Sequence, residues 1–559
     1  MKKVLSLLLA TVLALGVCAC GDNNSLTSSQ QSSTTNETSS LDENSTTQTS
    51  SEDISSEVTS SEESVDTEVK ITVPLLDKDL KTMKRVKILP LGDSFTATAP
   101  MAYRWYLHTM LYQNGNFFEF VGSKQTSDPR LGSNYERHEG TGGHKSTNGL
   151  EVYNTKIAGG KIKYDVMVLF YGINDVREEG QVAEFEKNYT ALLDAIFTDR
   201  PDAIIYAIGA PKEYTAKATE KIANSFKSKG YDITYVNMYQ RDDVKFDSKE
   251  DYLTITVEKG HPNSNGYKKF AGVLFDAMKD KITELNKQTE NNTKVPMAVN
   301  QVILDTTSLN LAIGEEHEMV AQIIPEFADV QTVLWQSSNP KVCEVDEYGM
   351  VKAVGAGSCS IVGYSLDGKA SATCKVTVKN EKFAFVGDYK EKVFKDSFET
   401  GENWDANSQG YIVTPATKNM NFGWGATSDL TLSTTSVYNA GANFDLSFYA
   451  AVNANIGNKT DERYVALSFG DYKLAVGNCA SQVILYYKNK EVGRKTFNVH
   501  AYDLMQYRIV TKDGTAYVYR NQELLFEAKT GTSENSGTVT VEWHTRSGVG
   551  VVDGILIKK

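Results

Sequence analysis

Residues 70–287 alternate between two periods of hydrophobicity, and this alternation is the strongest constraint on the fold. Five apolar runs have the length of a buried strand: 86–91, 117–121, 165–171, 203–208 and 233–238. Apolar residues recur at helical spacing over 103–113, 182–197 and 265–286. Strands that alternate with helices form parallel sheets that are covered on both faces. The sequence therefore predicts a three-layer α/β domain over 70–287.

The pattern changes near residue 296, where the helical periods end. Short strand-like runs separated by Gly, Asn and Asp occupy the rest of the chain. Apolar and polar residues alternate at 507–510 and 538–543, as expected for half-buried strands. This region predicts two all-β sandwich domains, one over 298–379 and one over 380–559.

The first 20 residues have the pattern of an export signal. Two lysines precede an apolar run over residues 4–17, which is too short to span a bilayer as a helix. Residues 17–20 (Val-Cys-Ala-Cys) resemble a bacterial lipobox, which implies that Cys20 becomes an acylated amino terminus. We therefore expect residues 1–20 to be a lipoprotein signal peptide. The mature protein is then exported and anchored to the cell membrane by lipid, with a plain secretory peptide as the alternative.

Residues 21–69 consist mainly of Ser, Thr, Glu, Asn and Gln and have almost no aromatic side chains. Such a segment cannot bury enough apolar area to offset its chain entropy. We expect it to be a disordered linker that holds the following domains away from the membrane surface.

The composition excludes one class of partner and gives no sign of a cofactor. The net charge of -13 disfavours nucleic acid, because a nucleic-acid-binding protein needs a basic face. Beyond the signal, the cysteines are few and scattered, at 343, 359, 374 and 479, so no disulfide framework is predicted. No Cys/His spacing predicts a metal site.

The first predicted strand ends in Gly92-Asp93-Ser94. A serine in this place stands at the carboxyl edge of a parallel sheet, where open α/β folds bind their ligands. A strand followed by an ordinary Asp-Ser turn or helix cap explains these three residues equally well.

Three further patterns follow at the ends of predicted elements. Residues 137–144 form a glycine-rich loop whose main-chain N–H groups can approach a ligand closely. Residues 172–175 (Gly-Ile-Asn-Asp) place an amide side chain at the end of the third strand, and residues 261–263 (His-Pro-Asn) place an imidazole before the last helix. Each pattern alone is more often a turn or a cap than a site.

In this order, the four patterns resemble the four blocks of the SGNH (GDSL-type) hydrolases and are most similar to carbohydrate esterase family 3, the acetylxylan esterases. Residues 87–94, 120–123 and 138–140 add to the resemblance, which covers about 84–280. It implies a flavodoxin-like three-layer α/β fold and ester hydrolysis that needs neither cofactor nor metal.

The resemblance also implies roles for individual residues. Ser94 is the expected nucleophile, and His261 is the expected general base. The oxyanion hole is expected from the Ser94 N–H, Asn174 and a glycine of the loop. Alignment places that glycine at Gly143, with Gly142 as the alternative.

Asp93 and Asp175, which adjoin the expected nucleophile and oxyanion donor, are assigned supporting roles. The third triad member is open, because Glu258 stands where the family usually has aspartate. Glu258 can orient the imidazole, although its extra methylene shifts the carboxylate by about one bond length. Otherwise the site is a Ser-His dyad with a backbone carbonyl holding the ring, and Asp251 is a more distant candidate.

The two β regions carry resemblances of their own. Residues 298–379 resemble bacterial immunoglobulin-like group 2 domains through 335–340 (Trp-Gln-Ser-Ser-Asn-Pro) and the glycine-rich 349–357. Residues 380–559 resemble concanavalin-type or laminin-G-like sandwiches. Trp404, Trp424 and Trp543 can stack on sugar rings, although core packing is the more common role of such side chains.

These observations predict an exported esterase that hydrolyses acetyl or similarly small acyl esters on a plant polysaccharide such as xylan. One alternative keeps the chemistry but changes the substrate to lipid or peptidoglycan acyl esters. Another is a non-catalytic glycan-binding protein of the cell surface, which the glutamate at position 258 motivates.

Overall fold

A computed structural model gives the fold. It describes residues 80–97, 103–125, 130–132, 134–176, 178–238, 241–247, 251, 261–292, 295–396, 403–404, 420–421, 430–452, 464–477, 482–497, 505–544 and 550–559. The expected signal peptide with Cys20, the expected linker over 21–69 and Glu258 lie outside the described residues.

The α/β domain is organised around β1 (Val86–Gly92). The strand order of its sheet is β3-β4-β1-β5-β6-β7, and β2 also pairs with β1. The other strands are β2 (Phe118–Phe120), β3 (Lys124–Gln125), β4 (Arg137–Gly140), β5 (Val166–Phe170), β6 (Ile204–Gly209) and β7 (Ile233–Asn237). Every pairing is parallel except β3 with β4. The carboxyl ends of β1, β4 and β5 therefore meet at one edge of the sheet, beside the central crossover.

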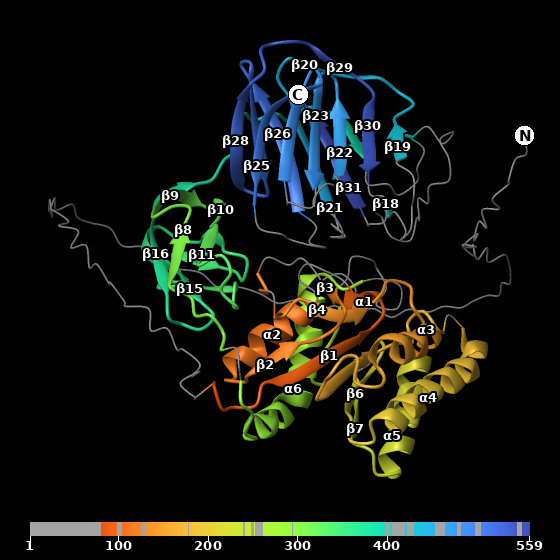
Figure 1. Ribbon diagram of the computed structural model, residues 1–559. Helices are drawn as coiled ribbons and strands as arrows, with labels where there is room; N and C mark the ends of the chain where they lie inside the picture. Colours follow the sequence, from red (N-terminus) through yellow and green to blue (C-terminus); the bar gives the residue numbers. More distant parts are fainter. Residues whose placement is uncertain are drawn as a thin grey trace, which may run out of the picture. The chain divides into compact units, whose positions relative to one another are not determined.

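Helices cover both faces of this sheet (Figure 1). α2 (Tyr103–Gln113) and α6 (Ser264–Asn286) pack on one face. The other face carries α3 (Ser146–Val152), α4 (Val182–Asp199) and α5 (Glu213–Ser228). The short elements are α1 (Ser94–Ala97), η1 (Tyr153–Ile157) and η2 (Glu179–Gln181). This is the three-layer α/β fold that the sequence predicts.

The side chains of β5 show how the two helical layers share one strand. Val168 and Phe170 belong to the core beneath α2 and α6, whereas Met167 and Leu169 belong to the core beneath α3, α4 and α5. Because both faces are covered, every residue of β5 is buried. The continuous apolar run in the sequence follows from this double coverage.

The predicted elements of this domain are confirmed with shifts of one or two residues at their ends. α2 has the predicted limits, and α4 extends the predicted helix from 197 to Asp199. The structure adds α3 and α5, which the sequence reading did not predict. It also corrects the reading of 137–144 as a loop throughout, because 137–140 form β4.

The rest of the described chain consists of strands. The immunoglobulin-like region contains β8 (Gln301–Leu304), β9 (Ser308–Ile313), β10 (Glu316–Glu318), β11 (Ala321–Ile324), β12 (Val333–Ser337), β13 (Cys343–Val345), β14 (Met350–Ala353), β15 (Gly357–Ser365) and β16 (Ser371–Lys382). They form sheets ordered β12-β15-β16-β9, β10-β14-β13 and β11-β8. Apolar side chains from all three sheets fill a common core.

Two large sheets make up the carboxyl-terminal region, ordered β17-β31-β21-β26-β27-β28 and β19-β30-β22-β23-β24-β25. Their strands, with β18, β20 and β29, are β17 (Lys392–Asp396), β18 (Met420–Asn421), β19 (Leu430–Ser433), β20 (Tyr438–Gly441), β21 (Asp445–Val452), β22 (Tyr464–Phe469), β23 (Tyr472–Gly477), β24 (Gln482–Tyr487), β25 (Lys490–Thr496), β26 (Met505–Lys512), β27 (Thr515–Arg520), β28 (Glu523–Lys529), β29 (Asn535–Gly537), β30 (Val539–His544) and β31 (Gly550–Lys558). Side chains from both sheets share one core, so the region is a β-sandwich.

Two of the three tryptophans proposed for sugar stacking are part of the sandwich core. Trp404 is 4% exposed and Trp543 is 1% exposed. Neither side chain can present a face to a sugar ring in this structure, so packing is their role. Trp424 lies outside the described residues.

Side-chain contacts between described residues link the three folded regions. The Tyr106 hydroxyl of α2 lies 3.4 Å from the Tyr348 hydroxyl, and Tyr348 belongs to the same buried cluster as α2. Arg520 of β27 forms a buried ion pair with Glu318 of β10 at 2.5 Å and a second with Glu523 of β28 at 2.7 Å.

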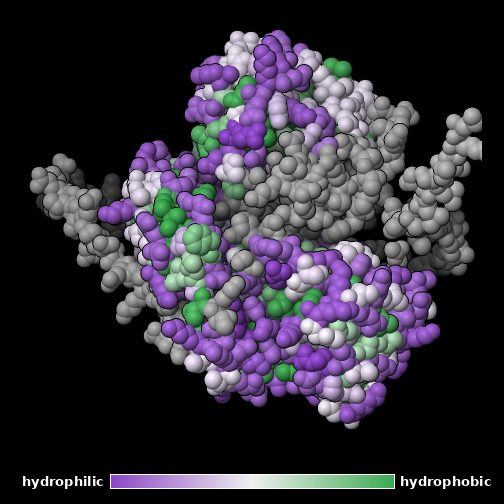
Figure 2. Space-filling model, in the orientation of Figure 1, coloured by the Kyte–Doolittle hydropathy of each residue, from purple (hydrophilic) through white to green (hydrophobic). Residues whose placement is uncertain are grey.

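The described surface is mainly hydrophilic. Figure 2 shows one face of the molecule, on which hydrophobic residues form small separate patches. Among the described helices, none is both long enough and apolar enough to cross a membrane.

Candidate active site

Ser94 lies where β1 turns sharply into α1. Its side chain is 6% exposed, and the preceding N–H of Asp93 donates to the Phe170 carbonyl of β5 at 3.2 Å. A Cβ added at Gly92 would lie 2.5 Å from Thr96 Oγ1 and 2.6 Å from the Phe170 oxygen. Only glycine fits at the end of this strand, and the tight turn brings Ser94 to the carboxyl edge of the sheet.

Asp93 is a buried carboxyl group inside that turn. Burial raises its pKa to about 8, with a further contribution from the nearby Asp175 carboxylate. Its Oδ1 accepts a hydrogen bond from the Phe95 N–H at 3.0 Å, whereas no described group is hydrogen-bonded to its Oδ2. Near neutral pH the protonated carboxyl therefore predominates, and its place behind the serine fits a supporting role.

The glycine-rich loop is held against the serine turn by main-chain contacts. The Thr141 N–H donates to the Gly92 carbonyl at 3.0 Å. At Gly140, a Cβ would lie 2.5 Å from the Ala97 nitrogen of α1, so α1 and β4 approach each other more closely than any side chain would allow. Gly143, the expected oxyanion donor, is exposed and has a φ of 74°, in the left-handed region.

Two side chains that sequence reasoning did not assign to the site anchor this loop. Lys124 Nζ donates to the Gly140 carbonyl at 2.8 Å and also to Thr141 Oγ1. His138 Nδ1 accepts a hydrogen bond from the Gly140 N–H at 2.9 Å. Burial lowers the pKa of His138 to about 2, so its imidazole is neutral. The His138 side chain is buried, at 4% exposure.

Asn174 follows β5 and contacts the glycine-rich loop. Its Nδ2 donates to the His144 carbonyl at 3.0 Å. An amide nitrogen carries two protons, so this bond orients the side chain while the second proton can serve a ligand. Asn174 therefore bridges two of the four segments that the resemblance assigns to the site.

The residues around Asn174 are fixed by charged groups. Asp175 accepts from the Ser146 N–H at 2.9 Å and from the Ser146 hydroxyl at 2.5 Å, at the start of α3. Burial raises the pKa of Asp175, and the hydrogen bonds from Ser146 oppose that rise. Lys212 Nζ donates to the carbonyls of Ile173 at 2.9 Å and Val176 at 3.2 Å. These contacts confine the main chain on both sides of Asn174.

His261 lies directly before α6 and packs beside the serine turn. Its ring centroid is 4.8 Å from that of Phe95, the residue that follows Ser94. Its Nδ1 lies 3.0 Å from the Tyr267 hydroxyl. Burial lowers the pKa of His261 to about 3, so the imidazole is neutral and can accept a proton.

The loop that carries His261 is tied to α6 and to Asp251. The Asn263 side chain accepts from the Gly266 N–H at 3.1 Å and caps the helix. The Asn263 N–H donates to the Asp251 carbonyl at 2.9 Å. The Asp251 carboxylate pairs with Lys269 Nζ at 2.6 Å, so the described contacts give this residue a structural role. Glu258 lies outside the described residues, and its role remains a prediction.

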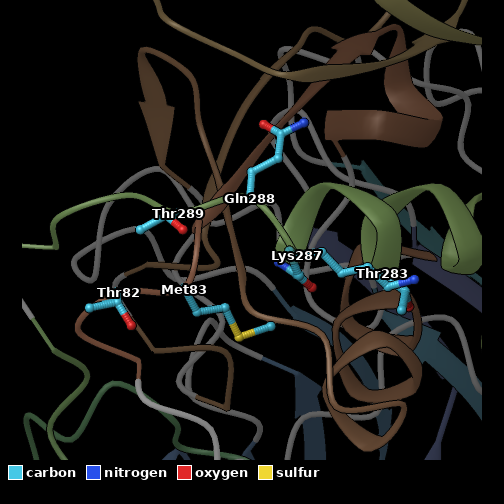
Figure 3. Close-up of a pocket in the computed structure, with 7 residues that line it drawn as sticks. Thr82, Met83, Thr283, Lys287, Gln288 and Thr289 are labelled. Atoms are coloured by element: carbon cyan, nitrogen blue, oxygen red, sulfur yellow. The ribbon is translucent and has the colours of Figure 1, made fainter.

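A pocket of about 290 Å³ elsewhere in the domain can be set aside as the reaction site. Figure 3 shows its lining residues, among them Met83 before β1 and Lys287 after α6. Met83 bridges to Thr289 beyond the amino end of β1, whereas Ser94 follows its carboxyl end. No serine, histidine or carboxylate is among the lining residues.

Taken together, the site consists of a serine, a neutral imidazole and an amide donor carried by three adjacent segments of one sheet edge. The sequence analysis proposed Ser94, Asn174 and His261 on the basis of local patterns, and their catalytic roles stay a prediction. It missed Lys124 and Lys212, because a lysine that binds distant main-chain carbonyls carries no local signal. Such an arrangement can support nucleophilic attack by the serine with the imidazole as base.

Comparison with protein families identifies two segments of the chain. Residues 91–269 match the model of the GDSL-like lipase/acylhydrolase family. Residues 298–376 match the model of the bacterial Ig-like domain, group 2. These matches confirm the two resemblances stated from the sequence.

Several solved structures are similar to part of the chain. A family 3 carbohydrate esterase of Clostridium thermocellum is 25% identical, with a TM-score of 0.30, and covers 36% of this chain and 100% of its own. A family 3 carbohydrate esterase from Talaromyces cellulolyticus is 20% identical, with a TM-score of 0.26, over 36% and 99%. A lipase/acylhydrolase from Enterococcus faecalis is 16% identical, with a TM-score of 0.27, over 37% and 100%.

Matches to curated proteins are short. An uncharacterised protein of Clostridium acetobutylicum is 41% identical over 78 residues, which is 13% of this chain and 20% of that protein. A 3-O-alpha-D-galactosyl-alpha-L-arabinofuranosidase of Bifidobacterium longum is 37% identical over 73 residues, which is 13% of this chain and 6% of that protein. The chain thus spans a fifth or less of the length of these two relatives.

Proposed function

Taking residues 91–269 as a GDSL-like acylhydrolase domain, we propose that this protein is a serine esterase that removes acetyl or similarly small acyl groups from a polysaccharide such as xylan. The observation that carries the proposal is the packing of the neutral His261 ring against Phe95, beside Ser94 at the carboxyl edge of the sheet. The likeness to carbohydrate esterases of family 3 supports the choice of substrate class.

In the proposed reaction, Ser94 Oγ attacks the acyl carbon while His261 takes the hydroxyl proton. The negative charge that develops on the carbonyl oxygen is stabilised by N–H donors from Asn174, Gly143 and the Ser94 main chain. His261 then returns the proton to the leaving sugar hydroxyl. Water hydrolyses the acyl-serine with the same base, which releases the carboxylic acid and restores the enzyme.

Acetate release from acetylated xylan tests this proposal. The purified full chain should release acetate, and Ser94→Ala should abolish the release. Asn174→Ala should lower kcat about a hundredfold with little change in KM, because an oxyanion donor acts mainly in the transition state. Equal rates for the native protein and Ser94→Ala would contradict the nucleophile assignment.

The acyl group and its carrier are tested separately. A series of nitrophenyl esters with increasing chain length should show the highest kcat/KM for acetate. A preference for long acyl chains would instead favour a lipid substrate, because the matched family includes lipases as well as acylhydrolases. Failure of a fluorophosphonate to label Ser94 in folded protein would favour a non-catalytic glycan-binding protein.

We further propose that the enzyme acts outside the cell as a lipid-anchored protein. The support is the sequence of residues 1–20, with Cys20 as the acylation site. Cys20→Ser should move the protein from the membrane fraction to the medium or the soluble fraction. An unchanged membrane association would contradict the anchor.

A further inference from the structure

We propose that Tyr267 is a positioning residue for the base, which it orients through a hydrogen bond between its hydroxyl and Nδ1 of His261. The inference rests on the proposed function of His261. The two atoms lie 3.0 Å apart, a normal hydrogen-bond distance. In this proposal Tyr267 acts through the imidazole.

The surroundings of Tyr267 make it a rigid support. Its side chain is 1% exposed and lies in the first turn of α6. The Asn263 cap fixes the histidine loop to that same turn. Phe95 packs against both rings, with centroid distances of 4.8 Å to His261 and 6.2 Å to Tyr267. Phe95, which follows Ser94, thus contacts both the histidine and the tyrosine rings.

The direction of the hydrogen bond follows from the chemistry. A base that takes the Ser94 proton must hold a lone pair on the nitrogen that faces the serine. Because Nδ1 faces Tyr267, Nε2 is the nitrogen that exchanges the proton with Ser94. Nδ1 must then carry hydrogen and donate to the Tyr267 oxygen. By accepting from Nδ1–H, the Tyr267 oxygen stabilises the tautomer in which Nε2 can act as the base.

This arrangement differs from one in which a carboxylate holds the ring. A hydroxyl oxygen can accept from Nδ1–H and orient the ring, but it carries no charge to stabilise the imidazolium that forms during attack. The two cases give opposite expectations for variants of Tyr267 and Glu258. If Tyr267 positions the base, Tyr267→Phe is the damaging change and Glu258→Gln is mild.

Steady-state kinetics on the full chain with nitrophenyl acetate provide the first test. Tyr267→Phe should lower kcat about 10- to 100-fold, the usual effect of losing a hydrogen bond to a group that becomes charged, with KM within about twofold. Tyr189→Phe is the matched control, because Tyr189 is fully buried on α4 and its hydroxyl has no described hydrogen-bond partner. It should leave kcat unchanged.

The tautomer of His261 provides the second test and does not depend on turnover. In 15N-histidine-labelled protein, with His261 assigned through His261→Asn, the native ring should carry its proton on Nδ1, and Tyr267→Phe should reduce that preference. A native ring protonated on Nε2 would overturn the proposal, and this observation needs no variant to fold. A proton that stays on Nδ1 in Tyr267→Phe would also overturn it.

Two kinetic outcomes would overturn the proposal as well. One is an unchanged kcat in Tyr267→Phe; the other is a larger loss of kcat in Glu258→Gln than in Tyr267→Phe. If the native protein hydrolyses no ester, the proposed function fails. The tautomer measurement still decides whether Tyr267 orients the ring.

Discussion

At the scale of single residues, burial sets the protonation of three side chains near Ser94. It lowers the pKa of His261 to about 3 and that of His138 to about 2, and it raises the pKa of Asp93 to about 8. All three shifts favour the uncharged form. At neutral pH these three side chains are therefore mainly uncharged.

Asp93 makes stability depend on pH. Its pKa rises from the ordinary value of 3.8 to about 8 in the folded state. The folded protein therefore keeps a proton between about pH 4 and pH 8 that the unfolded chain has lost. This contribution to stability is fully present below about pH 4 and is lost as the pH rises to about 8. Asp93→Asn should reduce the fall in the free energy of unfolding with rising pH by up to about 1.4 kcal/mol per pH unit.

Urea denaturation at pH 5, 6, 7 and 8 measures this effect. The native protein should lose stability across the series, and Asp93→Asn should lose less. Asp175 has a raised pKa of the same sign, so a residual slope in the variant is expected. If the free energy of unfolding depended on pH in the same way in both proteins, Asp93 would not be the group that holds the proton.

Local patterns could point to candidate site residues next to strand ends and turns, because such features depend on consecutive residues in the sequence. Ser94, Asn174 and His261 all lie within about four residues of an element limit. Lys124 and Lys212 bind carbonyls that are distant in the sequence, and Tyr267 lies within a helix. Their roles depend on the fold, so the sequence alone could not assign them.

At the scale of elements, the junction of β4 and α1 decides the shape of the site. Residues 137–140 are mostly charged and end in glycine, so their sequence does not predict a strand. In the structure they form a strand in which His138 and Glu139 are buried. α5 was missed for a related reason: much of its buried face is small or polar, including Thr215, Ala216 and Thr219. Long apolar strands and helices were predictable, whereas elements defined by close backbone packing were not.

Gly140→Ala tests that junction. The added Cβ would lie 2.5 Å from the Ala97 nitrogen and 2.7 Å from the Thr96 carbonyl carbon. Because both neighbours are main-chain atoms, we expect a loss of about 3 kcal/mol in the free energy of unfolding and reduced esterase activity. Gly180→Ala is the control, since no atom lies within 4 Å of its Cβ position, and it should change stability by less than about 0.5 kcal/mol. Equal unfolding midpoints in urea would contradict this account.

At the scale of the whole molecule, buried polar contacts connect domains that the sequence shows only as separate regions. Arg520, fully buried, pairs with Glu318 of the immunoglobulin-like region and Glu523 of the sandwich. The sequence predicts the domain boundary, because the helical spacing of apolar residues ends where the strand-like runs begin. It cannot show which charged residues meet across the boundary, since those pairs are far apart in the sequence.

Arg520→Met should lower the free energy of unfolding by about 3–5 kcal/mol, because it leaves two buried carboxylates without their cation. Arg520→Met combined with Glu318→Gln should recover part of the loss. Urea denaturation measures both, with initial rates of ester hydrolysis at 25 °C as the control. The rates should stay at the native level because Arg520 belongs to no element of the α/β domain. A variant as stable as the native protein would show that the pair contributes nothing.

Ser94, the proposed nucleophile, follows the first strand of the α/β domain, and His261, the proposed base, precedes its last helix. In a chain that has formed its sheet but has not docked α6, Ser94 is in place but His261 is not yet beside it. If these roles are correct, activity requires a docked α6, and recovery of esterase activity during refolding should be the last signal to return. With these proposed roles, a growing chain has no complete site before residues 261–286 have been synthesised and packed.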